Sequence, residues 1–378
     1  MGLFKPAWQS GNSDKALKAV AKENDPKTLV QIIVNSDSWA VKQAALSKLT
    51  DENMLAEAAL ETGDYSIYEA IITKMEDVNA LERLAGYENG RTRGREEEYE
   101  YDGGQLSTYR EVRYDSDKCR AAAQRQIERI ALTSTSIASR EAAVRLIEDK
   151  SVLAQVAKQD KEYSVCALAM GKLPNLSFYS HYLIKAVLPD VRIEGIKSLD
   201  ISDAWVVGTI QEIVENEAHI QVFHEAVKKL TDEKVLKEIV LSPARQGVFK
   251  NIPLNGIDLT GIRQSALKNI TEPAFLEKIA RMGKEELNAI TQDVNNGLRI
   301  IAIENISDQA TLKRLWKHFV PDGAFPTRMT MDIRPLNALI GKMTDCDFIK
   351  GIMQNCGSDI EDVARSRLVE LQDSGVEA

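Results

Sequence analysis

One short pattern recurs nine times along this chain of 378 residues, and it constrains the fold more than any other feature. Around the anchor Leu49, an apolar residue lies eight positions before, a small residue four before, a large apolar residue three before and an apolar residue six after. Apolar residues at such offsets share one face of a helix. Each copy therefore predicts two helices joined by a short turn. The other anchors are Met75, Ile147, Leu173, Leu199, Leu230, Ile270, Ile306 and Met343.

The residue two positions after the anchor predicts where the second helix begins. It is Asp51, Asp77, Asp149, Asn175, Asp232, Glu272, Asp308 or Asp345. The ninth copy has Ile201 there, between Asp200 and Ser202, which can substitute. Asp and Asn accept hydrogen bonds from the unpaired amides at a helix start, and a carboxylate suits the helix dipole. We therefore expect these acids to be structural caps, each contributing about 1 kcal/mol.

The small position and the first apolar position indicate how the copies stack. The small position holds Ala or Gly in seven copies: Ala45, Ala143, Ala169, Gly195, Ala226, Ala266 and Ala302. A small residue inside an apolar stripe lets a neighbouring helix approach closely, as stacked repeats require. A base follows the first apolar position in several copies, namely Lys42, Arg192, Arg263 and Arg299, and Arg140 follows Ser139 at the same position of another copy. We expect these bases either to form a ladder with the acidic caps of the next copy or to lie at a solvated edge.

Three of these segments resemble bacterial HEAT-like repeats, including those called PBS-lyase HEAT-like or variant leucine-rich repeats. They are VKQAALSKLTD at 41–51, SREAAV at 139–144 and IRQSAL at 262–267. The resemblance extends over about 15–371, in degenerate copies. It implies an all-α fold, a right-handed α-solenoid of about ten helical hairpins that binds a partner. It transfers no catalytic residue, because the matching positions are packing and capping positions.

The spacing of the anchors divides the chain into segments. Residues 1–85 are predicted to form an N-terminal cap and the first repeats, and 118–371 to continue the array. Breaks rich in Pro and Gly predict loops at about 243–259 and 320–335, which are also candidate binding elements. Residues 372–378 form a polar tail. The segment 86–117 interrupts the array and is unlike the rest of the sequence.

The interruption at 86–117 is rich in Tyr, Arg and Glu, and contains half of the tyrosines of the chain. Aromatic and charged residues alternate on both sides of Asp102-Gly103, a dipeptide that suits a tight two-residue turn. The segment is therefore predicted to form a β-hairpin or, alternatively, a charged loop. Tyr and Arg are enriched at binding hot spots. The candidate partner-binding residues are Tyr99, Tyr101, Tyr109, Arg110, Arg113 and Tyr114.

Composition narrows the classes of partner. The net charge of −9 disfavours nucleic acid, although one basic face on an acidic protein would still permit it. The cysteines are Cys119, Cys166, Cys346 and Cys356, whose wide spacing fits a reducing compartment. We see neither a signal peptide nor an apolar run of membrane-spanning length. The expected location is the cytoplasm, and the expected partner is another protein or peptide.

Residues with catalytic potential are sparse. His219 and His224 are five residues apart, whereas a zinc-binding helix places its histidines four apart. We find no nucleophile elbow and no phosphate-binding loop. We therefore expect a non-enzymatic scaffold that needs no cofactor and no metal. Two alternatives remain at this point: a nucleic-acid-binding or base-repair protein of the HEAT-like kind, and a modifying enzyme such as a chromophore lyase.

Overall fold

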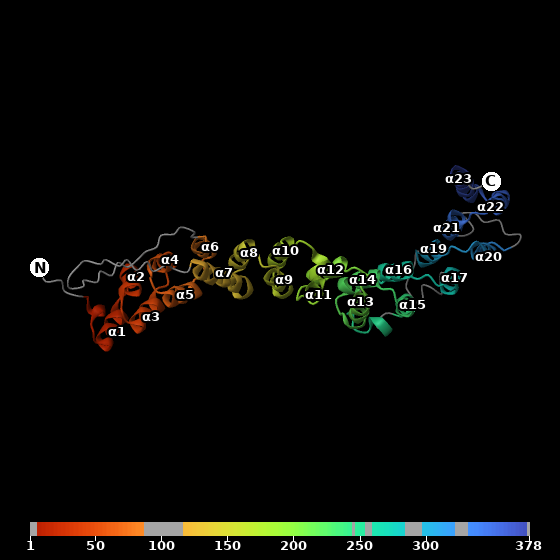
Figure 1. Cartoon of the computed structure of the whole chain (residues 1–378). Helices are drawn as coiled ribbons and strands as arrows, with labels where there is room; N and C mark the ends of the chain where they lie inside the picture. Colours follow the sequence, from red (N-terminus) through yellow and green to blue (C-terminus); the bar gives the residue numbers. More distant parts are fainter. Residues whose placement is uncertain are drawn as a thin grey trace. The chain divides into compact units, whose positions relative to one another are not determined.

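A computed structural model describes residues 6–86, 116–243, 246–253, 259–283, 297–321 and 332–375 (Figure 1). Throughout these ranges the regular secondary structure is helical, without a strand. The prediction of an all-α protein is confirmed for them. The chain divides into two compact units, Met1–Gly195 and Ile196–Ala378, and each is described by itself. None of the described helices combines the length and apolar character that crossing a bilayer requires.

Unit 1 contains a short 3-10 helix followed by α-helices of mostly similar length. They are η1 (Ala7–Gln9), α1 (Ser13–Lys22), α2 (Pro26–Asn35), α3 (Trp39–Lys48), α4 (Glu52–Glu61), α5 (Tyr65–Lys74), α6 (Val78–Ala85), α7 (Ser116–Thr133), α8 (Ile137–Leu146), α9 (Lys150–Gln159), α10 (Tyr163–Gly171) and α11 (Leu176–Leu183). The boundary between the units falls within α12 (Pro189–Ser198).

Unit 2 continues with helices of the same kind. They are α13 (Ala204–Asn216), α14 (Ile220–Lys229), α15 (Glu233–Leu241), η2 (Gly247–Phe249), α16 (Thr260–Lys268), α17 (Pro273–Arg281), α19 (Gly297–Asn305), α20 (Gln309–Phe319), α21 (Arg334–Lys342), α22 (Cys346–Gln354) and α23 (Ser358–Asp373). Within the predicted loop 243–259, Phe249 of η2 is fully buried and its ring lies 5.7 Å from that of Phe223. This part of the loop is therefore packed into the body of unit 2.

The turn inside each copy follows the predicted capping chemistry. Leu49 ends α3 in an extended conformation, and the Asp51 carboxylate accepts the amides of Asn53 at 2.9 Å and Met54 at 3.0 Å. The predicted caps that accept an amide of the next helix in this way are Asp51, Asp77, Asp149, Asn175, Asp232, Asp308 and Asp345. Seven of the eight predicted caps are thus confirmed.

Two capping predictions are wrong. Glu272 occupies the N-cap position of α17 without a side-chain capping bond, because a Glu is one methylene longer than the Asp that suits this geometry. In the copy with Ile201, the N-cap of α13 is Asp203, so the chain turns two residues later than the template predicts. Asp200 instead accepts the amide of Ser202 at 2.9 Å, inside the turn.

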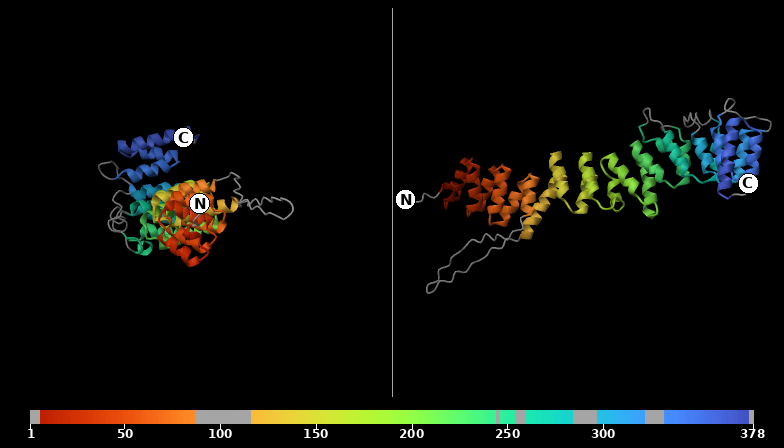
Figure 2. Two further views of the ribbon diagram at one scale, coloured as in Figure 1. Left: turned by 90° about the vertical axis from the view of Figure 1, so that its left-hand side faces the viewer. Right: turned by 90° about the horizontal axis from the view of Figure 1, so that it is seen from above.

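The packing is repetitive: the second helix of a pair contacts the first helix of the next pair, and corresponding helices of neighbouring pairs contact each other. In unit 1, for example, α2 contacts α3 and α4, and α10 contacts α8 and α9. Figure 2 shows the helices within each unit lying side by side in chain order. The small positions Ala45, Ala143 and Ala169 are fully buried where first helices of neighbouring pairs meet. This is the role that their size predicts.

Helix α7 takes the place of a whole pair. Its N-terminal part fits the repeated pattern loosely, with Cys119, Ala123 and Ile127 at the first apolar, small and anchor positions, but the chain does not turn after Ile127. The helix runs on to Thr133 and contacts α5 as well as α9. One long helix therefore joins the pairs on either side of it and keeps the array continuous.

The first and last described helices pack onto their neighbours. Trp8 of η1 packs against the core of unit 1. At the other end, α23 contacts α21 and α22 and places Ile360, Ala364 and Leu371 in the core. The exposed positions of α23 are polar apart from Val369, which is 52% exposed.

Candidate functional surface

A repeated set of polar side chains donates hydrogen bonds to main-chain carbonyls at the helix ends that precede them in the array. Lys74 Nζ donates to the carbonyls of Leu46 at 2.6 Å and Ser47 at 3.0 Å, at the end of α3. These carbonyls have no partner within their own helix, so the lysine satisfies them. Six of the residues that do this lie directly before an anchor, and the seventh, Gln126, lies in α7. They are Lys48, Lys74, Gln126, Lys172, Lys229, Asn269 and Asn305.

In unit 2 a second set of contacts joins neighbouring second helices. Lys237 of α15 pairs with Glu272 at the start of α17, and its ammonium lies 5.7 Å from the centre of the Phe275 ring. Lys313 of α20 makes the same contacts with Asp345 and with Phe348, here at 5.4 Å. Two of the acids predicted to be caps, Glu272 and Asp345, therefore meet a base from the preceding copy. That base lies on the second helix, seven residues after the anchor.

The bases predicted to form that ladder lie elsewhere. Arg140 donates to both carboxylate oxygens of Asp160, at 2.7 and 3.0 Å, in a nearly buried pair. Lys42 Nζ lies 3.8 Å from the carboxylate of Asp64, which is the N-cap of α5, the first helix of the next copy. The other three donate to main-chain carbonyls: Arg192 to Ala186, Arg263 to Ser242 and Arg299 to Ala280. These bases neither pair with the predicted acidic caps of the next copy nor lie free at a solvated edge. Both predictions are wrong for them, because they bind carboxylates and carbonyls in loops and at helix ends.

One pair in unit 2 combines a base and a hydroxyl. His224 Nε2 of α14 lies 2.9 Å from Ser265 Oγ of α16, and burial lowers the pKa of the imidazole. Ser265 lies in the middle of a helix, where the neighbouring amides are already hydrogen bonded and offer no oxyanion hole. The contact therefore joins two helices and lacks the remaining parts of a nucleophilic site.

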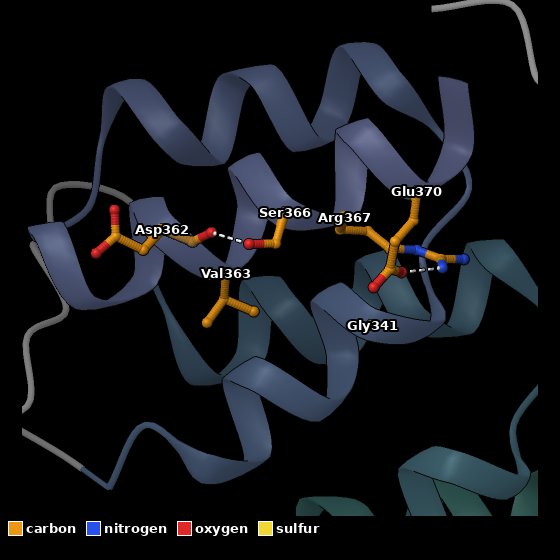
Figure 3. A pocket seen from close by; sticks show the side chains of 6 residues that line it. All are labelled: Gly341, Asp362, Val363, Ser366, Arg367 and Glu370. Atoms are coloured by element: carbon orange, nitrogen blue, oxygen red, sulfur yellow. Dashed lines mark hydrogen bonds and ion pairs between the residues drawn. The ribbon is translucent and has the colours of Figure 1, made fainter. Parts of the chain in front are cut away.

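Other side chains that could take part in catalysis are also buried or held in structural contacts. Burial raises the pKa of the Cys166 thiol to about 12, so the reactive thiolate is scarce. A small pocket of about 250 Å³ lies along α21 and α23, and Figure 3 shows the side chains that line it. There Ser366 donates to the carbonyl of Asp362 and Arg367 pairs with Glu370, so both potential functional groups are occupied. Among the described residues no group of three His, Cys, Asp or Glu side chains is placed to hold a metal ion.

The strongest candidate surface lies on α9 and α11 of unit 1, which contact each other. Phe178 is 72% exposed and Tyr182, one turn later, is 39% exposed. The rings are held by neighbours: Phe178 packs edge-on against Tyr179 with centroids 5.0 Å apart, and Lys158 of α9 lies 6.0 Å from the centre of the Tyr182 ring. We call Lys158, Phe178, His181, Tyr182, Lys185 and Val187 the α9–α11 surface.

The segment after α11 completes this surface. Lys185 and Val187 are exposed, and the Val187 amide donates to the Lys158 carbonyl at 2.9 Å. That bond fixes the segment to the end of α9. Neither α9 nor α11 contains an Asp or Glu, so the charged side chains on this surface are those of Lys158 and Lys185, with the imidazole of His181 beside them. The result is an aromatic and cationic surface on a chain of net charge −9.

The six residues predicted to bind a partner, Tyr99 to Tyr114, lie outside the described residues, and so does the predicted hairpin. The α9–α11 surface was not predicted from the sequence. A signal was present, because α11 reads LSFYSHYL and carries aromatic or imidazole rings at 178, 179, 181 and 182. Rings at these positions spread around a helix, so some of them had to face solvent.

Comparisons with known proteins place this chain in no family. No family model and no curated protein matches it. Among solved structures, one match is a designed protein from work on the computational design of self-assembling cyclic homo-oligomers. It is 12% identical, with 96% of this chain and 92% of the other covered, at a TM-score of 0.12. A score this low supports no inference about fold or function.

Proposed function

We propose that this chain is a non-enzymatic scaffold that binds another protein. We further propose that its helices form a right-handed α-solenoid of about ten HEAT-like hairpins and that it acts in the cytoplasm. The solenoid is supported by the repeated pair of helices and by contacts that link each copy to the one before. The compartment is supported by the free thiols of Cys119, Cys166, Cys346 and Cys356.

The α9–α11 surface is the observation that carries the proposal. Folding does not require Phe178 to be exposed at 72% of its area, and an exposed aromatic group framed by polar residues is typical of an interaction site. The catalytic alternatives lack comparable support, since His224, Ser265 and Ser366 all make structural hydrogen bonds.

Single-stranded nucleic acid is the second candidate ligand for this scaffold. Lys158 beside Tyr182 is the combination on which a base can stack while its phosphate is neutralised. Helix α4, an earlier second helix of unit 1, carries Glu57 and Glu61, so the basic character does not extend over all the second helices of the unit. A protein partner therefore fits the surface better than a long polyanion does.

Affinity capture from a native extract tests the proposal. The bait is the full chain, compared with a Phe178→Ala/Tyr182→Ala double variant and with Trp39→Ala as the matched control. Trp39 is equally prominent, at 60% exposure, but lies at the start of α3. We expect the wild type and Trp39→Ala to capture proteins that the double variant does not capture. Equal capture by all three would contradict the proposal, and capture abolished by nuclease would favour the second candidate.

A further inference from the structure

We infer that the α9–α11 surface binds an acidic peptide segment in which carboxylates flank a large apolar residue. This inference rests on the proposed function and specifies the chemistry of the partner. Charge is the first argument for it. From Lys150 to Lys185 the chain has five lysines against two acids, within a protein of net charge −9. One of the two acids, Asp160, is neutralised by Arg140.

The arrangement of side chains gives the second argument. Phe178 and Tyr182 are four residues apart and share one side of α11. Lys158 lies beside the Tyr182 ring, and the Lys185 amide bonds the Tyr182 carbonyl at 3.1 Å in the turn that follows α11. An apolar anchor of the partner would contact Phe178 and Val187, while its carboxylates would reach the two ammonium groups.

The number of charges favours a peptide over a nucleic acid. The two lysines, Lys158 and Lys185, match a short segment with two carboxylates. A nucleic acid adds one negative charge per nucleotide, and the remaining phosphates would meet a protein of net charge −9. Apolar contact area is also supplied more readily by a peptide side chain, because Val187 offers no ring for a base to stack on.

Selection of binders from a random dodecapeptide library on phage, with the full chain as target, tests the inference. We expect enriched peptides to carry net negative charge around a Leu, Ile or aromatic residue. A synthetic copy of the most enriched peptide should bind roughly tenfold more weakly to Lys158→Glu/Lys185→Glu and more weakly at high salt. Lys27→Glu, an exposed charge reversal on α2, is the matched control and should leave the affinity unchanged.

The outcomes separate the two proposals. Enriched peptides that are neutral or basic, yet lose binding with Phe178→Ala, would overturn the acidic ligand and leave the scaffold surface intact. Peptides that bind Phe178→Ala as well as the wild type would overturn the surface itself, and so would a selection that enriches no sequence. Circular dichroism of each variant, unchanged from wild type, confirms that losses of binding do not arise from unfolding.

Discussion

At the scale of the residue, size and solvation decide what each repeated position tolerates. Gly195 is the one small position without a methyl group. A Cβ placed there would lie 2.7 Å from Leu183 Cβ and 2.8 Å from the Ile184 amide nitrogen. Gly195→Ala should therefore lower the free energy of unfolding by about 1–3 kcal/mol, because the backbone of α11 would have to move. Urea denaturation measures the change.

Gly171 provides the matched control for this substitution, since a Cβ at that glycine would meet nothing within 4 Å. Gly171→Ala should leave stability unchanged or raise it by up to about 1 kcal/mol, through the better helix propensity of Ala. Equal stability of both variants and the wild type would show that the close approach of α11 at Gly195 is not needed.

The imidazole of His224 predicts a dependence on pH. Burial lowers its pKa below the ordinary 6.5, and Lys228 acts in the same direction. Between the lowered value and 6.5 the unfolded chain binds more protons than the folded one, so this group destabilises the fold as the pH falls through that window. An NMR titration of the His224 ring proton should give a midpoint below 6.5. A midpoint at or above 6.5 would contradict the buried, neutral ring.

At the scale of the element, contacts between copies matter more than contacts within one helix. Lys74 supplies two charge-assisted hydrogen bonds to the end of α3, and burial lowers the pKa of its ammonium. Lys74→Met keeps the apolar stem and removes the donor, so it should destabilise unit 1 by about 1–2 kcal/mol in urea denaturation. Lys27→Met, exposed on α2, is the control and should change little. A Lys74→Met variant as stable as the control would refute the bridging role.

The helices could be predicted from the sequence because their signals are local. The period of the apolar residues and the carboxylate of Asp51 or Asp308 act within one or two turns of chain. The bridge from Lys74 to Leu46 could not, since it joins residues 28 apart and depends on how two copies stack. The same holds for the α9–α11 surface. Whether Phe178 or Tyr179 faces solvent is decided by the packing of α11 on α9.

At the scale of the whole molecule, two segments compete for the role of binding element. One is the predicted Tyr- and Arg-rich insertion, and the other is the α9–α11 surface. Stability within a helical array comes from neighbouring elements. Helices α6 and α7, which flank the insertion in sequence, pack directly on each other, and α5 also contacts α7. The helices before and after the insertion therefore pack on each other directly, without the residues between them.

We expect replacement of residues 88–115 by a short Gly-Ser linker to leave the far-UV circular dichroism per helical residue and the melting temperature nearly unchanged. The α6–α7 contact supplies the neighbour that each helix requires. A control variant keeps the length and composition of the segment but shuffles its order. If the α9–α11 surface is the binding element, both variants should still capture the partner that Phe178→Ala/Tyr182→Ala loses. Loss of capture by both would assign binding to Tyr99, Tyr101, Tyr109, Arg110, Arg113 and Tyr114. A clear fall in melting temperature for both would instead show that the native segment packs against the array.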